Sequence, residues 1–224
     1  MESSKHSNYQ ILPSCLKSIL QYEELDIKSR WEKERLKYIL NHLKFENKRI
    51  LDIGGNTGFF SFEAITAGAL HVDYYEGNES HAKFVKVATE AVGMEKKITI
   101  FPEYYLFHED KRKYDITLCL NVLHHLGMDF EAKCSIEMVK KRILECINSL
   151  SLVTDYLVLQ LGFNWYGNIE KCLFENGTKQ EMEQYVVNGT EGLWELLFIG
   201  IAEKKDNEIL YADLNENNNI RNNE

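Results

Sequence analysis

This sequence could do chemistry at a glycine-rich segment. The segment lies between a short apolar run and a stretch that is compatible with a helix. Residues 50–58 read ILDIGGNTG, so an aliphatic run that contains Asp52 leads into Gly54, Gly55 and Gly58. Glycine adopts a positive φ without strain and has no Cβ, so a ligand can approach the main chain closely. The order of strand, glycine turn and helix is typical of loops that bind nucleotide-like cofactors.

A carboxylate follows at the end of the next predicted strand. Glu76 lies 22 residues after Gly54, and an acidic side chain at that place can accept two hydrogen bonds from a ribose diol. Its negative charge would repel a 2′-phosphate. The alternative is a solvated carboxylate that caps the next helix beside Gly77. The glycine loop, the spacing and the strand end together favour the ligand.

Two adjacent histidines, His124 and His125, follow the most apolar predicted strand. Histidine suits a general base because its ordinary pKa of about 6.5 lies near working pH. A single histidine in a core is more often structural than catalytic. We therefore expect one of the pair to face the substrate and the other to bond to the sheet or to a helix end. His125 is the preferred base, and His124 is the alternative.

The glycine loop resembles the first motif of class I S-adenosyl-L-methionine (SAM)-dependent methyltransferases, acidic-x-Gly-x-Gly-x-Gly. Asn56 stands where that motif has its middle glycine. Asparagine tolerates the left-handed region better than other non-glycine residues, so the departure is mild. The resemblance implies SAM as cofactor and S-adenosyl-L-homocysteine as product, with Asp52 fixing the loop and helping to receive the ammonium group. The cofactor-binding residues that it implies are Asp52, Gly54, Gly55, Asn56, Gly58, Glu76, Glu103, Asn121 and Val122.

A second resemblance concerns residues 121–127, NVLHHLG. They are similar to the fourth motif of many small-molecule, lipid and sugar O-methyltransferases and of some tRNA-modifying relatives. The resemblance implies that Asn121 and Val122 flank the sulfonium and that the two histidines face the substrate cleft. After the third strand it suggests Glu103 for the adenine amine and Tyr104 for stacking, although a loop aromatic packed on the domain edge is equally plausible.

The stretch after the fifth predicted strand has two interpretations. Residues 160–168 read QLGFNWYGN, in which an amide and aromatic cluster is flanked by Gly162 and Gly167. Asparagine and tryptophan together can hydrogen-bond and stack a polar ring, which suggests a substrate pocket. A glycine-punctuated turn before the next helix explains the same residues, and the two interpretations stay open.

The elements that must position these residues alternate between strands and helices. The sequence predicts strands at 49–53, 71–75, 97–101, 114–122 and 155–163, and helices at 29–44, 59–69, 79–92 and 131–150. This alternation predicts a parallel sheet with right-handed crossovers. Two last strand-like runs, 193–202 and 208–214, are joined by a short polar turn and predict an antiparallel hairpin. The predicted fold is α/β, a seven-stranded, mostly parallel Rossmann-like methyltransferase sheet with a C-terminal antiparallel hairpin and helices on both faces.

Length and charge limit the classes of protein. With 224 residues the chain has room for one α/β domain, and we expect an N-terminal lid at 1–28, a methyltransferase domain at 29–214 and a disordered tail at 215–224. The formal net charge of −9 makes a nucleic acid an unlikely partner, because phosphate binding needs a basic surface. We expect a small-molecule substrate, and the oligomeric state stays open.

The cysteines and the apolar segments indicate a cytoplasmic protein. The five cysteines are an odd number without a Cys-x-x-Cys pair, which is typical of reduced thiols. The first ten residues lack a signal-peptide core, and no apolar run approaches the roughly 20 residues that span a bilayer. No His, Cys and Asp cluster has metal-ligand spacing, so no metal site is predicted.

The function that these features predict is SAM-dependent methyl transfer. The expected acceptor is an oxygen of a small polar molecule, such as a sugar or a surface-glycan precursor. A tRNA-modifying methyltransferase and a non-catalytic partner subunit with a methyltransferase fold are the alternatives. A nicotinamide-dependent oxidoreductase is disfavoured because the pattern Gly-x-Gly-x-x-Gly/Ala fails at Asn56 and at Phe59.

Overall fold

A computed structural model describes residues 10–17, 29–108, 111–126, 135–206, 208–216 and 218. The chain divides into two compact units: unit 1 is Met1–Tyr105 with Lys113–Leu118, and unit 2 is Leu106–Arg112 with Cys119–Glu224. Most of the predicted lid and of the predicted C-terminal tail lies outside the described residues. The division into lid, domain and tail therefore stays a prediction.

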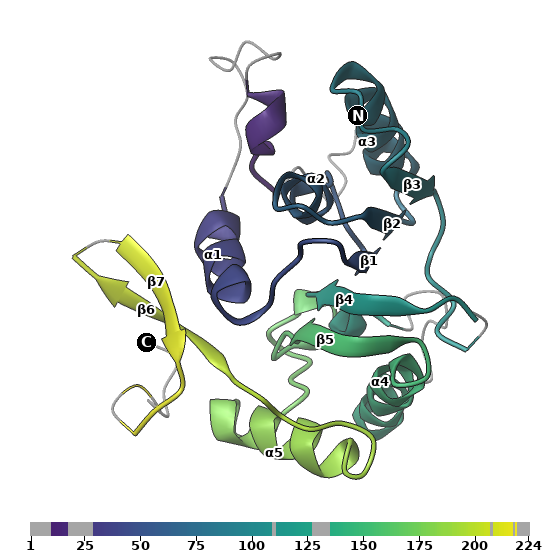
Figure 1. The fold of residues 1–224 in the computed structure, drawn as a ribbon. Helices are drawn as coiled ribbons and strands as arrows, with labels where there is room; N and C mark the ends of the chain where they lie inside the picture. The colour runs from purple at the N-terminus through teal and green to yellow at the C-terminus, as the bar shows by residue number, and fades with distance from the viewer. Residues whose placement is uncertain are drawn as a thin grey trace. The chain divides into compact units, whose positions relative to one another are not determined.

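Five strands form one sheet in the order β3-β2-β1-β4-β5 (Figure 1). Their bounds are β1 Arg49–Ile53, β2 His71–Tyr75, β3 Ile98–Phe101, β4 Tyr114–Leu120 and β5 Thr154–Gln160. The parallel register aligns Ile53 with Tyr75, and Tyr75 with Phe101, so β1, β2 and β3 end level with one another. The predicted α/β fold with a C-terminal antiparallel hairpin is confirmed, but the seven predicted strands form a five-stranded sheet and a separate two-stranded sheet. The order of the five strands is that of a doubly wound sheet.

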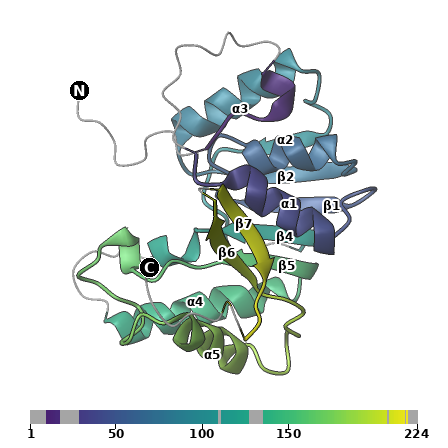
Figure 2. The same ribbon diagram turned by 90° about the vertical axis from the view of Figure 1, so that its left-hand side faces the viewer.

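Unit 1 is built around β1 and β2, whose last four residues are buried in each strand. Helix α2, Phe59–Thr66, is apolar on most sides because it contacts both strands and also α1, Glu32–His42, and the short 3₁₀ helix η1, Ser14–Leu16. Figure 2 shows α2 beside β2. The chain leaves the helix through Gly68, whose φ of 95° is left-handed. The helix therefore ends three residues before the predicted bound at 69.

Helix α3, Glu79–Ala91, follows β2 almost at the predicted bounds. Its start is fixed by Asn78, whose Oδ1 accepts the backbone N–H groups of Ser80 and His81. Asparagine is among the preferred residues at this capping position. The cap matters for the site because Asn78, which starts the helix, lies two residues after Glu76.

Unit 2 has its core between α4, Ile136–Leu150, and residues that follow β4 and β5. Val139, Ile143 and Ile147 recur at helical spacing along one side of α4 and are buried in this core. Helix α4 begins after Ser135, whose Oγ accepts the N–H of Met138 at 3.3 Å. Residues 131–134, where the sequence predicts its first turn, lie outside the described residues.

Helix α5, Lys179–Gly189, packs beside α4 in unit 2 (Figure 1). Asn148 donates from its side-chain amide to the carbonyl of Gly189 at 2.9 Å, and the hydroxyl of Tyr185 donates to the carbonyl of Lys140. The sequence pattern gives no bounds for this helix. Its sequence, KQEMEQYVVNG, is polar over its first half and has no buried residue, so its apolar periodicity is weak.

The C-terminal hairpin is present but differs in extent from the prediction. β6 spans Gly200–Lys205 and β7 spans Glu208–Asp213, whereas the sequence pattern predicts a first strand at 193–202 and a turn at 203–207. The charged residues 203–205 can lie in a strand because the hairpin forms a sheet of its own. Its turn needs few residues because Asp206 has a φ of 49°, the left-handed conformation that tight hairpins require.

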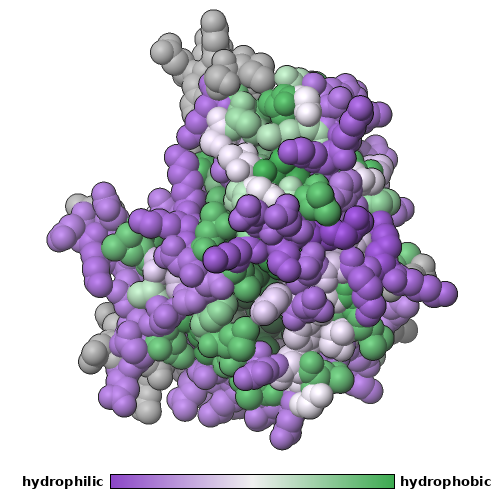
Figure 3. All heavy atoms as spheres, viewed as in Figure 1, coloured by the Kyte–Doolittle hydropathy of each residue, from purple (hydrophilic) through white to green (hydrophobic). Residues whose placement is uncertain are grey.

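Several large apolar side chains of unit 2 are exposed, and Figure 3 shows hydrophobic residues interspersed with hydrophilic ones on one face. They include Leu193, Leu196, Leu197 and Leu210. Among the described residues, no helix combines the length and the apolar character that crossing a membrane demands.

Candidate active site

The glycine loop between β1 and α2 takes a left-handed backbone at every second residue. The φ angles of Gly54, Asn56 and Gly58 are 66°, 52° and 83°. These are the three positions at which the motif acidic-x-Gly-x-Gly-x-Gly has glycine. Asn56 therefore adopts the conformation that the motif's middle glycine is suited to, and its Oδ1 accepts the N–H of Thr57 at 2.8 Å.

Gly55 is required for a different reason. It has no left-handed φ, but a Cβ added to it would lie 2.5 Å from the ring of Tyr74 and 2.9 Å from Oδ2 of Asp52. Tyr74 is completely buried, so its ring cannot move aside cheaply. Gly55 thus leaves room for the side chain of Tyr74, whose hydroxyl bonds to the loop at Asn56.

The end of β2 holds the loop through Glu76. One carboxylate oxygen accepts the N–H of Asn56 at 2.8 Å, and the other accepts the N–H of Asn78 at 2.8 Å. The hydroxyl of Tyr74 donates to the carbonyl of Asn56 from the same strand. Each carboxylate oxygen has a second lone pair, so Glu76 retains the capacity to accept a ribose diol.

Asp52 lies beneath the loop with 3% of its surface exposed. Its Oδ2 accepts the hydroxyl of Ser61 at 2.6 Å, which ties β1 to α2. Burial raises the pKa of Asp52 to about 6, although the Ser61 hydrogen bond acts to lower it; the charge of Glu76 adds to the increase. This geometry suits the predicted role of fixing the loop, while a contact with a cofactor ammonium stays a prediction.

Gln10 is a loop contact that sequence reasoning missed. Its side-chain Oε1 accepts the N–H of Phe59 at 3.2 Å and lies 3.4 Å from the hydroxyl of Thr57. Gln10 thereby satisfies the N–H of Phe59 in the first turn of α2, where backbone N–H groups lack helical partners. A lone glutamine 47 residues before Thr57 carries no sequence signal for such a contact.

After β3, Glu103 is exposed. The ring of Tyr104 is 72% exposed, yet one part of it lies against Gly77, where a Cβ would clash with it. Tyr104 is thus next to the residue that follows Glu76. The arrangement brings the candidate stacking residue close to the candidate ribose ligand. The role of Glu103 in binding the adenine amine stays a prediction.

The second group of predicted site residues belongs to unit 2. Asn121 has a left-handed φ of 61°, and its side-chain amide donates to Oε1 of Gln160 at 3.1 Å. Its backbone N–H donates to the carbonyl of Gln160 at 2.9 Å. Val122 is half-buried and packs on the core of unit 2. Asn121 thus ends β4 with a sharp change in chain direction.

His124 and His125 form the 3₁₀ turn η3, Leu123–His125, and their rings are 4.2 Å apart between centroids. His124 is buried, and its Nδ1 accepts the N–H of Gly162 at 3.2 Å, so the ring proton belongs on Nε2. Burial, with a smaller contribution from His125, lowers the pKa of His124 to about 4. His124 is therefore neutral at working pH and bonds to the chain after β5, whereas His125 is only half-buried.

The aromatic residues after β5 serve the fold of unit 2. Trp165 is buried, and its indole N–H donates to the carbonyl of Leu126 at 2.9 Å. The ring of Tyr166 stacks on it at 4.5 Å, and Nζ of Lys171 lies 5.0 Å from the Trp165 ring centroid. These contacts favour the interpretation of residues 160–168 as a structured turn over that of a substrate pocket.

Among the residues that the structure describes, no group of three or more His, Cys, Asp and Glu side chains is arranged to hold a metal ion. The predicted cofactor residues of unit 1, from Asp52 to Glu76, lie together around the glycine loop. The histidine pair and Asn121 lie together in unit 2.

No protein-family model matches the sequence, and no curated protein matches it. Among solved structures, the chain is similar to a SAM-dependent methyltransferase from Mesorhizobium loti, at 18% identity over 54% of this chain and 47% of that one, with a TM-score of 0.38. It is also similar to residues 961–1257 of the O-methyltransferase StiE, at 16% identity over 52% of this chain and 39% of that one, with a TM-score of 0.41. The chain spans less than half the length of either structure. Likeness at this level does not bear on activity.

Proposed function

We propose that this protein is a SAM-dependent methyltransferase that acts on an oxygen of a small polar acceptor, such as a sugar or a surface-glycan precursor. The observation that carries the proposal is the Glu76 carboxylate. It fixes the glycine loop through Asn56 at 2.8 Å and keeps lone pairs for a ribose diol. The left-handed backbone at 54, 56 and 58 supports the same assignment.

The residues around the glycine loop fit this cofactor. Glu76 would hold the ribose, the loop at 54–58 would pass beneath the amino-acid portion, and Tyr104 beside Gly77 would stack on the adenine. When bound, SAM supplies a methyl group on a sulfonium that is already activated. The protein's own task is then to align the acceptor and to remove a proton from its hydroxyl.

We assign the removal of that proton to His125. His124 is a poor candidate because its Nδ1 already accepts the N–H of Gly162 and its pKa is about 4. A base works best with a pKa near the operating pH. His125→Ala should therefore leave cofactor affinity unchanged and slow methyl transfer by roughly 10²- to 10⁴-fold.

Calorimetric titration with SAM, S-adenosyl-L-homocysteine and NAD tests the proposal, with Glu76→Ala alongside. Micromolar binding of the first two ligands, weakened in the variant, supports a methyltransferase. No binding of either would leave the non-catalytic partner subunit as the better description. Binding of NAD alone would point to an oxidoreductase, and RNA binding that weakens steeply with salt would favour the tRNA-modifying alternative.

A further inference from the structure

The side chain of Gln10 contacts the glycine loop where the chain enters α2. Its Oε1 accepts the N–H of Phe59 at 3.2 Å and lies 3.4 Å from the hydroxyl of Thr57, so the amide reaches the residues on both sides of Gly58. A backbone N–H can only donate a hydrogen bond. The amide atom that faces Phe59 is therefore the oxygen, and this contact fixes which way the amide is turned.

The nitrogen of this amide is available to a ligand. Among the residues that the structure describes, none hydrogen-bonds to Nε2 of Gln10. Gln10 is half-buried, so its two N–H groups have only partial access to water. A donor that has lost part of its hydration gains free energy when an acceptor reaches it. The amide thus offers two hydrogen-bond donors beside the glycine loop.

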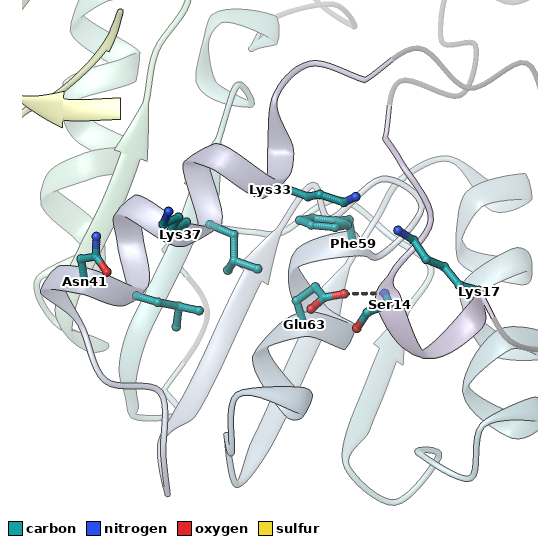
Figure 4. A pocket seen from close by; sticks show the side chains of 9 residues that line it. Ser14, Lys17, Lys33, Lys37, Asn41, Phe59 and Glu63 are labelled. Carbon is teal, nitrogen blue, oxygen red and sulfur yellow. Dashed lines mark hydrogen bonds between the residues drawn. The ribbon is translucent and has the colours of Figure 1, made fainter. Parts of the chain in front are cut away.

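Gln10 is held in this place by the segment that follows it. Leu12 and Leu16 are buried, and η1 packs on α2. The N–H of Ser14 donates to Oε1 of Glu63 at 2.5 Å, a bond that Figure 4 shows in the lining of a cavity between η1, α1 and α2. The donors of Gln10 are therefore presented by an anchored segment, which reduces the conformational entropy that is lost when a ligand binds.

The acidic residues around the loop lack such donors. The ionised side chains of Asp52 and Glu76 can only accept hydrogen bonds, which suits an ammonium group and a ribose diol but not a carboxylate. The amino-acid portion of SAM carries a carboxylate as well as an ammonium group. The amide of Gln10 supplies donors for this carboxylate, and the positive end of the α2 dipole beside Phe59 favours a negative charge there.

We propose that Gln10 binds the carboxylate of the amino-acid portion of SAM through Nε2, while its Oε1 stays on the N–H of Phe59. Gln10 is then a cofactor-binding residue outside the glycine loop and β2, and it makes affinity depend on that carboxylate. This role rests on the proposed function, because SAM is the ligand that it concerns.

Decarboxylated SAM is the matched probe, because it keeps the adenosine, the sulfonium and the amine of SAM and lacks only the carboxylate. In calorimetric titrations, the wild type should bind SAM roughly 10- to 100-fold more tightly than decarboxylated SAM, the range of hydrogen bonds to a charged group. Gln10→Ala should remove most of this preference for SAM. Gln180→Ala, at an exposed glutamine of α5, is the control and should keep the preference.

Gln10→Glu separates binding of the carboxylate from support of the loop. The glutamate keeps an oxygen for the N–H of Phe59 but replaces the two donors by a negative charge. It should weaken SAM about tenfold or more, because the new charge repels the carboxylate. It should bind decarboxylated SAM at least as tightly as the wild type does, because that ligand is a cation. An unchanged preference for SAM in Gln10→Ala and Gln10→Glu would overturn the proposal and leave Gln10 as a support of the loop.

The same titrations distinguish failure of this role from failure of the proposed function. A wild-type protein that binds SAM no more tightly than decarboxylated SAM would overturn the role of Gln10 and leave the proposed function in place. A wild-type protein that binds neither ligand would overturn both. Circular dichroism on each variant shows whether a loss of affinity reflects a folded protein.

Discussion

The carboxylate of Glu76 accepts the backbone N–H of Asn56 at 2.8 Å, so the end of β2 directly holds the glycine loop that follows β1. A second hydrogen bond, from the N–H of Asn78, fixes the other carboxylate oxygen. The candidate ribose ligand is thus held in place by two main-chain donors before any ligand arrives. A side chain fixed in this way loses little conformational entropy on binding.

Glu76→Ala should weaken SAM binding by about 1–3 kcal/mol, because it removes charge-assisted hydrogen bonds to the cofactor and releases Asn56. The SAM affinity of Glu76→Gln should lie between those of the wild type and Glu76→Ala, since the glutamine amide keeps one acceptor oxygen. Calorimetry measures the difference. The control is Glu79→Ala, an exposed acidic residue three positions later on α3. Wild-type affinity in Glu76→Ala would contradict the assignment of this residue.

Gly55→Ala should lower the free energy of unfolding by about 1–3 kcal/mol, the usual cost of overpacking a core. The new Cβ would lie 2.5 Å from the ring of Tyr74. Urea unfolding measures the loss, and a double-mutant cycle with Tyr74→Leu identifies its cause. The cost of Gly55→Ala should be smaller in the Tyr74→Leu background. An equal cost in both backgrounds would show that the ring is not what requires glycine.

The sequence predicts the conformation of the loop because that conformation depends on each residue's own preferences. Gly54 and Gly58 are left-handed as the motif requires, and Asn56 takes the same region because asparagine tolerates it. The strand ends are predictable for a similar reason. The apolar run to Tyr75 stops at a polar, glycine-containing segment, and β2 ends there.

Contacts between residues far apart in the chain could not be predicted in this way. Gln10 bonds to Phe59 only because η1, which follows Gln10 in the chain, packs on α2. The structural role of His124 depends equally on Gly162, the residue 38 positions away whose N–H it accepts. No periodicity or local motif records such pairings, since they arise from tertiary packing.

Asn56→Gly should keep cofactor affinity close to that of the wild type, because glycine adopts the observed φ of 52° without strain. It loses only the hydrogen bond from Thr57 to Oδ1 of Asn56. Asn56→Ala loses the same bond and places a Cβ in the left-handed region, at a further cost of about 1–2 kcal/mol. Urea unfolding and calorimetry on both variants test this order. A glycine variant less stable than the alanine variant would contradict the strain that this φ is expected to place on a residue with a Cβ.

His124 should make the protein less stable as the pH falls from about 6.5 to about 4. The pKa of its imidazole is about 4 in the folded protein and near 6.5 when unfolded. Between these values the unfolded state binds more protons, so its free energy falls relative to that of the folded state. The contribution of neutral His124 to the free energy of unfolding is fully present above pH 6.5, and about 3 kcal/mol of it is lost by pH 4.

Asp52 works in the opposite direction over part of this range, because its raised pKa of about 6 makes the folded state take up a proton first as the pH falls. The stability of the wild-type protein alone would therefore mix the two effects. Urea unfolding of wild type and His124→Gln at a series of pH values separates them, since both proteins contain Asp52. The advantage of the wild type over His124→Gln should shrink steadily below pH 6.5. A difference that stays constant down to pH 4 would mean that His124 titrates normally and does not hold Gly162 as a neutral acceptor.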